Sequence, residues 1–320
     1  MTKILLGTYT KSESGGIYEI DLNHDQLENL TLIAKAGNPT YLDFNASTQI
    51  LYSVYQNDEG AGIATWKYQG TETKLLETFV EAGPAPCYVA YDEPEDQIYD
   101  ANYHKGRVNV YKNHQVFKKI EYKDGSHAHF VNKKPGTEFV YVCDLGLDTV
   151  RKYELMNEIA TYKAPSGSGP RHLAFHPDLP ILYLFSEHTS HVTVLEDDGF
   201  DFIEHGTYDA LPDSDAIRSA AAIRISADGK NLYVSNRGHD SISVFKISSN
   251  GLKLELIQNI SSYGAHPRDF ALSPDNKHLV CANRDTHNLT LYARDPFSGT
   301  LTLLQSNVYA PECVAVIFIP

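Results

Sequence analysis

The sequence predicts an all-β fold: a seven-bladed β-propeller whose blades are four-stranded antiparallel sheets. Three observations lead to this fold class. A tyrosine-centred strand pattern repeats along the chain, each repeat offers about four short strands, and no amphipathic helix of useful length separates them. The composition agrees, because 21 Tyr and 13 Phe favour strands, while 2 Met and the lack of Ala/Leu/Glu/Lys-rich runs argue against long helices.

The repeat is marked by the residue in the middle of the second strand of each unit. Successive markers are separated by 47, 47, 42, 42, 50 and 47 residues. They are Leu5, Tyr52, Tyr99, Tyr141, Tyr183, Tyr233 and Val280. Seven units of this length are typical of a propeller with seven blades.

Each unit also contains further strands. About seven to eleven residues after the marker comes a β-branched and aromatic run, as in residues 191–197 (HVTVLED) and 241–247 (SISVFKI). A weaker outer strand follows, as in residues 74–82 (KLLETFVEA). The turns carry Asp, Asn, Gly and Pro, for example SADG at 226–229 and SPDN at 273–276. This pattern gives four strands per blade and disfavours parallel βαβ units.

The two ends of the chain are expected to share one blade. Residues 313–320 (CVAVIFIP) resemble an innermost strand with nothing after it to complete a sheet, and residues 4–9 and 15–20 supply the missing strands. Such sharing covers two exposed sheet edges and closes the ring. We therefore predict a single propeller domain over residues 1–320, and a monomer, since the ring closes on its own termini.

Charge and composition exclude several classes of function. The net charge of −14 disfavours binding to nucleic acid or to an anionic membrane. No stretch approaches the length of a membrane span, and the first residues contain too short an apolar run for a signal peptide, so we expect a cytoplasmic protein. The four cysteines lie far apart without metal-ligand spacing, which indicates reduced thiols and no metal site.

Several motifs together resemble one known family. They are residues 7–10 (GTYT) with 16–18 (GIY), 125–129 (GSHAH) with 144–148 (DLGLD), 169–177 (GPRHLAFHP) with Glu187, 232–237 (LYVSNR) and 266–270 (HPRDF). In this order the chain resembles, over essentially its whole length, the seven-bladed lactonase propellers of the bacterial 6-phosphogluconolactonase type. That family also contains carboxymuconate cyclase relatives, so the fold alone does not fix the reaction.

The candidate functional residues fall at two positions of the repeat. In a propeller, the loop leading into the innermost strand and the loop after the second strand open on the same face. Before innermost strands lie His127, His129, Arg171, His172, Arg218, Arg268 and Glu312, and after second strands lie Asp144, Glu187, Arg237 and Arg284. Several Arg and His at one mouth of an acidic protein suit an anionic ligand, because guanidinium groups match phosphate or carboxylate.

Each arginine also has a structural alternative, an ion pair that holds blades together. Arg268, next to Asp269, is the most open to this interpretation, and Arg171, sixteen residues before Glu187, is less so. His127 and His129 alternate along a strand and are expected to point to one side. Asp144 could bind ligand hydroxyls or cap a turn.

The resemblance implies hydrolysis of 6-phosphogluconolactone to 6-phosphogluconate in the pentose phosphate pathway, without a metal or cofactor. In that reaction Glu187, His127 or His129 would be the general base and Arg171 would stabilise the oxyanion. Arg237 and Arg268 would hold the phosphate, with His172 and Asp144 as further substrate contacts. Two alternatives stay open: a lactonase or cycloisomerase acting on another lactone or a carboxymuconate-type acid, and a non-catalytic binding propeller.

Overall fold

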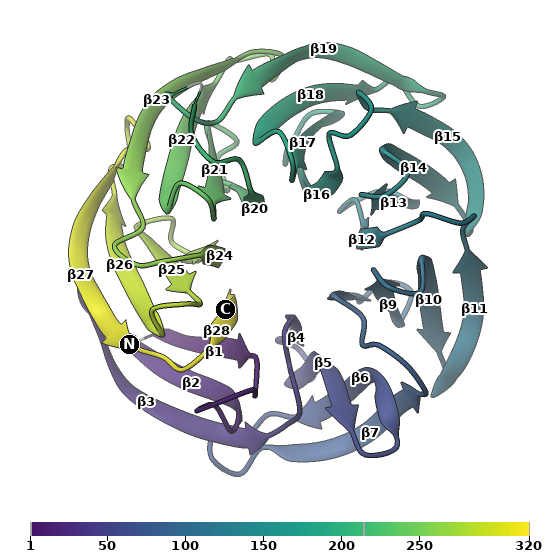
Figure 1. Cartoon of the computed structure of the whole chain (residues 1–320), viewed down its shortest axis with the longest axis vertical. Coiled ribbons are helices and arrows are strands. Elements are labelled where there is room, and N and C mark those ends of the chain that lie inside the picture. Colours follow the sequence, from purple (N-terminus) through teal and green to yellow (C-terminus); the bar gives the residue numbers. More distant parts are fainter. Residues whose placement is uncertain (1, 214, 320) are drawn as a thin grey trace.

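Seven four-stranded antiparallel sheets stand around a common axis in the computed structural model of the chain (Figure 1). The structure describes residues 2–213 and 215–319, so Pro320, which we assigned to the last strand, lies outside the described residues. Among these residues all regular structure is β-strand, and no helix has the length and hydropathy to cross a membrane. The predicted seven-bladed propeller is confirmed.

Each blade contributes one strand to each of four concentric rings. The innermost strands are β28 (Cys313–Phe318), β4 (Leu42–Asn45), β8 (Tyr88–Asp92), β12 (Ala128–Lys133), β16 (Pro170–Phe175), β20 (Ala220–Ile225) and β24 (Pro267–Leu272). The second strands are β1 (Thr2–Thr8), β5 (Ile50–Asn57), β9 (Gln97–Asn102), β13 (Phe139–Asp144), β17 (Ile181–Ser186), β21 (Asn231–Asn236) and β25 (His278–Asn283).

The outer half of each blade follows the same order. The third strands are β2 (Gly16–Asn23), β6 (Gly60–Lys67), β10 (Arg107–Lys112), β14 (Thr149–Glu154), β18 (His191–Asp197), β22 (Ser241–Ile247) and β26 (Asn288–Arg294). The outermost strands are β3 (Gln26–Lys35), β7 (Lys74–Glu81), β11 (Gln115–Glu121), β15 (Asn157–Lys163), β19 (Phe202–Asp209), β23 (Leu254–Ser261) and β27 (Leu301–Tyr309). We number the blades 1 to 7 from the one that holds β28, β1, β2 and β3.

Blade 1 is built from both ends of the chain, as the sequence predicts. Strand β28 pairs antiparallel with β1, with Ile4 opposite Phe318 and Leu6 opposite Val316. The pairing gives each strand a hydrogen-bonded neighbour at an edge that would otherwise be free, and it joins the first and last blades into a ring.

The marker residues form the core between the blades. All seven are buried, and the five tyrosines expose at most 5% of their surface. Burying an aromatic ring of this size stabilises a fold by about 2 kcal/mol, so the repeat seen in the sequence is a repeat of inter-blade packing.

Two of the marker tyrosines also tie one blade to the next. The Tyr183 hydroxyl donates to the Gly251 carbonyl at 2.9 Å, and the Tyr233 hydroxyl donates to the Gly299 carbonyl at 2.7 Å. Both glycines have a φ of about +80°, and a Cβ at Gly299 would lie 2.1 Å from the Asn231 side chain. Glycine is therefore required where the hairpin of one blade approaches its neighbour.

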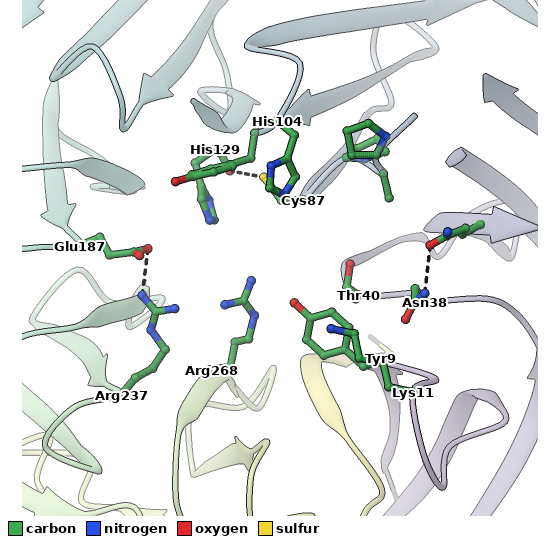
Figure 2. Close-up of a pocket in the computed structure, with 15 residues that line it drawn as sticks. Tyr9, Lys11, Asn38, Thr40, Cys87, His104, His129, Glu187, Arg237 and Arg268 are labelled. Carbon is green, nitrogen blue, oxygen red and sulfur yellow. Dashed lines mark hydrogen bonds and ion pairs between the residues drawn. The ribbon is translucent and has the colours of Figure 1, made fainter. Parts of the chain in front are cut away.

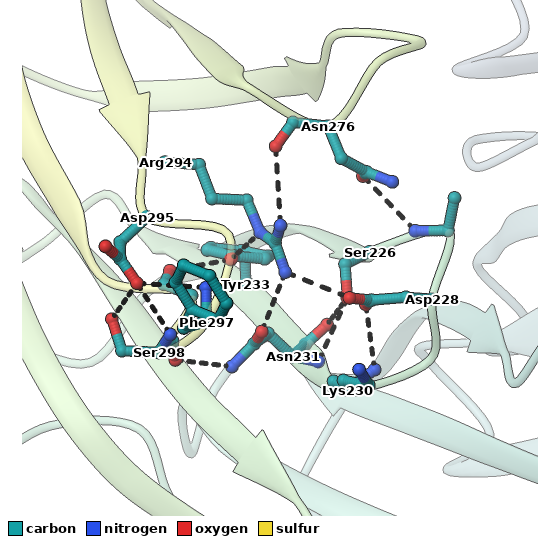
Figure 3. Close-up of polar contacts among 12 residues, drawn as sticks. Ser226, Asp228, Lys230, Asn231, Tyr233, Asn276, Arg294, Asp295, Phe297 and Ser298 are labelled. Carbon is teal, nitrogen blue, oxygen red and sulfur yellow. Dashed lines mark hydrogen bonds and ion pairs between the residues drawn. The ribbon is translucent and has the colours of Figure 1, made fainter.

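A polar cluster reinforces the contact between blades 6 and 7 (Figure 3). Arg294, at the end of β26, is 6% exposed. Its Nε donates to the Tyr233 hydroxyl at 2.7 Å and its Nη2 to Asn231 Oδ1 at 2.8 Å. The guanidinium thus joins the two blades, because its buried N–H groups find their hydrogen-bond acceptors on the neighbouring blade.

Blades 4 and 5 are joined by a buried ion pair. Lys152 is fully buried in β14, and its Nζ lies 2.7 Å from Asp197 Oδ1 at the end of β18. The second oxygen of Asp197 accepts a hydrogen bond from the Tyr141 hydroxyl. Both side-chain partners of this carboxylate belong to blade 4, so it fixes how blade 5 sits against blade 4.

Candidate active site

A cavity of about 420 Å³ lies on the face where loops precede the innermost strands and follow the second strands (Figure 2). Its volume falls within the range of small-molecule sites. All seven blades contribute to its lining, which comprises Tyr9, Lys11, Asn38, Thr40, Gln56, residues 84–86, Cys87, Tyr103, His104, His129, Glu187, Arg237 and Arg268. Four of the residues predicted from the sequence are therefore brought together: His129, Glu187, Arg237 and Arg268.

Glu187 is clamped between two arginines. Its Oε2 atom lies 2.8 Å from Arg171 Nε and 2.9 Å from a terminal nitrogen of Arg237. Pro170 pairs with Ser186 in the hairpin of β16 and β17, so Arg171 and Glu187 leave the end of that hairpin side by side. Arg237 follows β21 of the next blade. The carboxylate therefore bridges blades 5 and 6 at the cavity wall.

These ion pairs set the protonation states of Glu187 and of the two arginines. Although burial opposes ionisation, Arg171 and Arg237 lower the pKa of Glu187 to about 2. Burial and the neighbouring Arg237 lower the pKa of Arg171 to about 9, so its guanidinium is still charged at neutral pH. A carboxylate held in this way is a weak base, and its main effect is to orient two guanidinium groups.

His129 is the group best suited to accept a proton. It is 5% exposed and lines the cavity, and its Nδ1 is shielded from solvent with no hydrogen-bond partner among the residues that the structure describes, which leaves Nε2 as the ring nitrogen that can meet a water in the cavity. Burial and the nearby Arg171 lower the pKa of His129 well below its usual value. The imidazole is therefore neutral at pH 7, which is the form that a general base requires.

Arg268, which its position next to Asp269 made the strongest candidate for a structural ion pair, does not form one with that residue. Asp269 lies beside it in the chain but pairs with Arg224 at 2.9 Å, whereas Arg268 makes no ion pair within residues 2–213 and 215–319. Arg268 is the extra residue of a bulge in β24 and points into the cavity (Figure 2), whereas the Asp269 carboxylate is held by Arg224 and by the backbone N–H of Val316. Arg171, expected to be the freer of the two, is the one that is paired.

Bulges in the innermost strands aim three of these side chains. In β12, residues 128 and 130 pair with the consecutive residues 144 and 143 of β13, so His129 has no residue opposite it. Arg171 in β16 and Arg268 in β24 are unopposed in the same way. A bulge turns a side chain out of the regular alternation and is frequent beside functional sites. His129, Arg171 and Arg268 thus occupy the same place in blades 4, 5 and 7.

Four of the predicted residues lie outside the cavity lining: Arg171, Asp144, His127 and His172. Asp144 is fully buried, and its carboxylate accepts hydrogen bonds from Ser126 Oγ at 2.6 Å and from the backbone N–H groups of His127 and Leu147 at 2.9 and 3.1 Å. It is a turn cap, the second of the two roles that the sequence left open.

His127 and His172 are also occupied elsewhere. The His127 ring stacks on Tyr103 at 4.2 Å and its Nδ1 bonds to the Tyr103 carbonyl, so it does not share the orientation of His129. The bulge at His129 is the reason, because it breaks the alternation that we assumed. His172 is 2% exposed and lies against the rings of Tyr88 and His129, beneath the cavity.

Comparison with known proteins is decisive about the family. Residues 3–318 match the family described as lactonase, 7-bladed beta-propeller. The chain belongs to this lactonase family. It is 36% identical to the 6-phosphogluconolactonase of Bacillus subtilis, with 100% of this chain and 99% of that protein covered.

Solved structures agree with this assignment. A protein of Lactobacillus plantarum has a TM-score of 0.96 and 40% identity, with both chains fully covered. The periplasmic gluconolactonase of Pseudomonas aeruginosa has a TM-score of 0.90 and 25% identity, with 100% of this chain and 99% of that chain covered. The likenesses support a lactonase hydrolase and include proteins named for a phosphorylated and for an unphosphorylated lactone.

Several lining residues of this lactonase escaped the sequence analysis. Tyr9, Gln56 and Tyr103 each follow the marker of their blade by four residues, as Glu187 and Arg237 do. Thr40 and Cys87 each precede their marker by twelve residues, as His129 and Arg268 do. The repeat therefore contained the signal, but we searched those positions for charged groups only.

The lining of this lactonase differs in chemistry from one side to the other. Blades 4 to 7 supply the His129 imidazole, the Glu187 carboxylate and two guanidinium groups, and blade 3 adds a second imidazole, that of His104. Blades 1 and 2 supply hydroxyl and amide groups and Lys11. Burial raises the pKa of Cys87 to about 12, so its thiol is protonated and is a poor nucleophile. Within the described part of the chain, no three His, Cys, Asp or Glu side chains come together to hold a metal ion.

Proposed function

We propose that the protein hydrolyses 6-phosphogluconolactone to 6-phosphogluconate in the pentose phosphate pathway. The observation that carries the proposal is the neutral, unpartnered imidazole of His129 in one cavity with Glu187, Arg237 and the unpaired Arg268. A lactone ester is already reactive, so a base, an oxyanion stabiliser and an anion-binding group are sufficient. The Bacillus subtilis relative named 6-phosphogluconolactonase supports the choice of substrate.

In the proposed reaction, His129 removes a proton from a water molecule as the water attacks the lactone carbonyl carbon. The carbonyl oxygen gains negative charge in the tetrahedral intermediate, and Arg237, held by Glu187, stabilises it. The intermediate then collapses, the bond to the ring oxygen breaks, and the imidazolium returns the proton to that oxygen. The product is the open-chain acid, and His129 is neutral again.

Arg171 takes a different role from the one we expected. It is 2% exposed and does not line the cavity, so it acts on the reaction through Glu187 and does not contact the oxyanion. Its Nη1 donates to the Ala221 carbonyl at 2.5 Å, which fixes the guanidinium from behind. Arg268 is left as the cavity arginine that is free to bind the phosphate.

The test is a coupled assay with purified protein and freshly generated 6-phosphogluconolactone, with 6-phosphogluconate detected by its dehydrogenase. The lactone also hydrolyses spontaneously, so the measured quantity is acceleration over that background. We expect strong acceleration by the wild type and at least a 100-fold lower kcat for His129→Gln. His205→Gln is the matched control, because His205 pairs with Glu196 on an outer strand. A folded wild-type protein that gives no acceleration would overturn the proposal.

A second candidate is hydrolysis of an unphosphorylated sugar lactone. The Pseudomonas aeruginosa relative is named a gluconolactonase, and the hydroxyl and amide groups of blades 1 and 2 would bind any sugar lactone. The same protein assayed with glucono-δ-lactone separates the two candidates. A higher kcat/KM with glucono-δ-lactone than with the phosphorylated lactone would favour the second.

We further propose that the protein acts as a cytoplasmic monomer. Phosphorylated sugars are charged and are kept inside the cell, and one chain supplies the whole lining of the cavity. Sedimentation at micromolar concentration should give a mass near 35.7 kDa. A stable dimer would contradict the monomer, and activity found outside the cytoplasmic fraction would contradict the location.

A further inference from the structure

The loop of residues 9–14 brings two side chains of blade 1 to the cavity. It follows β1, and both Tyr9 and Lys11 line the cavity on the side next to Arg268 (Figure 2). Residues 7–10 carry part of the family resemblance, but their sequence pattern indicates no role for this loop. Its geometry assigns it one.

The carboxylate of a single residue, Glu312, binds the backbone of this loop. Glu312 lies just before the innermost strand β28 and is 6% exposed. Its carboxylate accepts hydrogen bonds, at 3.0–3.1 Å, from four consecutive backbone N–H groups, those of Lys11, Ser12, Glu13 and Ser14. Although burial opposes ionisation, these amides lower the pKa of Glu312. Such converging amides form an anion-binding nest, here filled by the protein's own side chain.

The loop is also fixed on its other flank. The Thr10 backbone N–H donates to Asn38 Oδ1 and the Asn38 backbone N–H donates to Thr10 Oγ1, each at 3.1 Å. Asn38 Nδ2 in turn donates to Gln56 Oε1 at 3.0 Å. Blades 1 and 2 therefore hold the loop in place without a bound ligand, so the positions of Tyr9 and Lys11 are preorganised.

Lys11 is an unpaired cation in this otherwise well-paired region. Its Nζ lies 4.6 Å from the centre of the Tyr9 ring and makes no ion pair with any residue of the described ranges. Arg268 of the adjacent blade 7 is likewise unpaired. Two free cations on neighbouring blades, in a protein with a net charge of −14, favour a ligand group with two negative charges at this wall. His129 and Glu187 lie on the other side of Arg237, where the carbonyl would react.

We propose that Lys11 determines specificity for phosphorylated lactones by binding the phosphate together with Arg268, and that Glu312 is a positioning residue that acts through Lys11. The inference rests on the proposed function, since it names how that site recognises the phosphate. It places the phosphate between blades 7 and 1 and the reacting carbonyl near blades 4 to 6. The sugar would therefore lie across the cavity, along the hydroxyl and amide groups of blade 2.

The first test compares Lys11→Met with the wild type on two lactones. For 6-phosphogluconolactone we expect KM to rise about 10-fold with kcat changed less than 2-fold, because one charge-assisted contact of the ground state is lost. For glucono-δ-lactone neither constant should change. Lys253→Met, at an exposed lysine in the β22–β23 hairpin, is the control. An equal effect on both lactones, or no effect on either, would overturn the role of Lys11.

The second test asks whether Glu312 acts through Lys11. Glu312→Gln should raise KM for the phosphorylated lactone with kcat changed less than 2-fold, because an amide cannot accept from all four N–H groups. In the Lys11→Met background the same substitution should change KM less than 2-fold, since the group that it positions is absent. Two outcomes would show that Glu312 has a merely structural role. One is that Glu312→Gln lowers kcat and raises KM to the same extent on both lactones. The other is that the changes in KM of the two single variants multiply in the double variant.

A binding measurement keeps this inference separate from the proposed reaction. Calorimetry with 6-phosphogluconate and with gluconate needs no catalysis. We expect Lys11→Met to raise the Kd for 6-phosphogluconate about 10-fold and to leave the Kd for gluconate unchanged. If the wild type binds 6-phosphogluconate in this way but does not accelerate hydrolysis, the proposed function fails while the phosphate site stands. If the wild type binds both acids equally, the phosphate site fails whatever the assay shows.

Discussion

Arg171 Nε lies 2.8 Å from Glu187 Oε2, although Glu187 comes sixteen positions later in the chain. The hairpin of β16 and β17 places them side by side, and the Glu187 backbone is fixed at both ends: its N–H donates to the Gly169 carbonyl at 2.7 Å and its carbonyl accepts from Ala220 at 2.8 Å. The carboxylate is therefore a fixed counter-ion, placed where it also reaches Arg237.

Glu187→Gln should lower kcat about 100-fold and change KM by a smaller factor. The substitution removes the charge that holds Arg237 at the cavity wall, and oxyanion stabilisation acts mainly in the transition state. The measurement is steady-state kinetics with 6-phosphogluconolactone. An unchanged kcat would remove both Glu187 and the clamp from the mechanism.

The pH profile should show no acid limb near pH 6.5. Burial and Arg171 lower the pKa of His129, so its neutral form persists as the pH falls below the usual histidine value. Glu187, with a pKa of about 2, stays ionised over the same range. We expect kcat/KM, corrected for spontaneous hydrolysis, to stay level between pH 5.5 and pH 7.5 and to fall only at lower pH. A half-loss of activity at about pH 6.5 would argue against His129 as the base.

The two cavity arginines should respond differently to the same substitution. Arg268→Met removes an unpaired guanidinium, so we expect KM for the phosphorylated lactone to rise at least 10-fold with Tm changed by about 1 °C or less. Arg237→Met deprives Glu187 of a partner that is 9% exposed, so we expect a lower kcat together with a lower Tm. Thermal unfolding and kinetics on both variants check this contrast, and equal changes in Tm would contradict it.

The fold was predictable from the sequence because one structural need recurs in every blade. A marker such as Tyr183 fills the space between two blades, so its spacing reports the blade count directly. The site was predictable only in part. Adjacency in sequence suggested a pair of Arg268 with Asp269, but a bulge turns Arg268 into the cavity, and Asp269 pairs with Arg224 instead.

What the sequence did not reveal depends on three-dimensional register. The bulge that aims His129 into the cavity cannot be seen in a pattern of alternating residues. Lys11 and Glu312 lie at opposite ends of the chain, and only the pairing of β1 with β28 brings them together. The positions four residues after and twelve residues before each marker were visible, and they would have added Tyr9 and Gln56 to the site.

Lys152→Met should destabilise the protein by about 3–5 kcal/mol, because it leaves the Asp197 carboxylate buried at 5% exposure without its counter-ion. Lys112→Met is the matched control: Lys112 lies 3.5 Å from Glu95 in a partly exposed pair, and such pairs contribute about 1 kcal/mol or less. Urea unfolding of both variants gives the two free energies. Similar losses for the two lysines would mean that the Lys152–Asp197 pair does not fix blade 5 against blade 4. A large loss for Lys152→Met that Asp197→Asn in the same chain partly restores would assign the cost to the unpaired buried charge, because the amide needs no counter-ion.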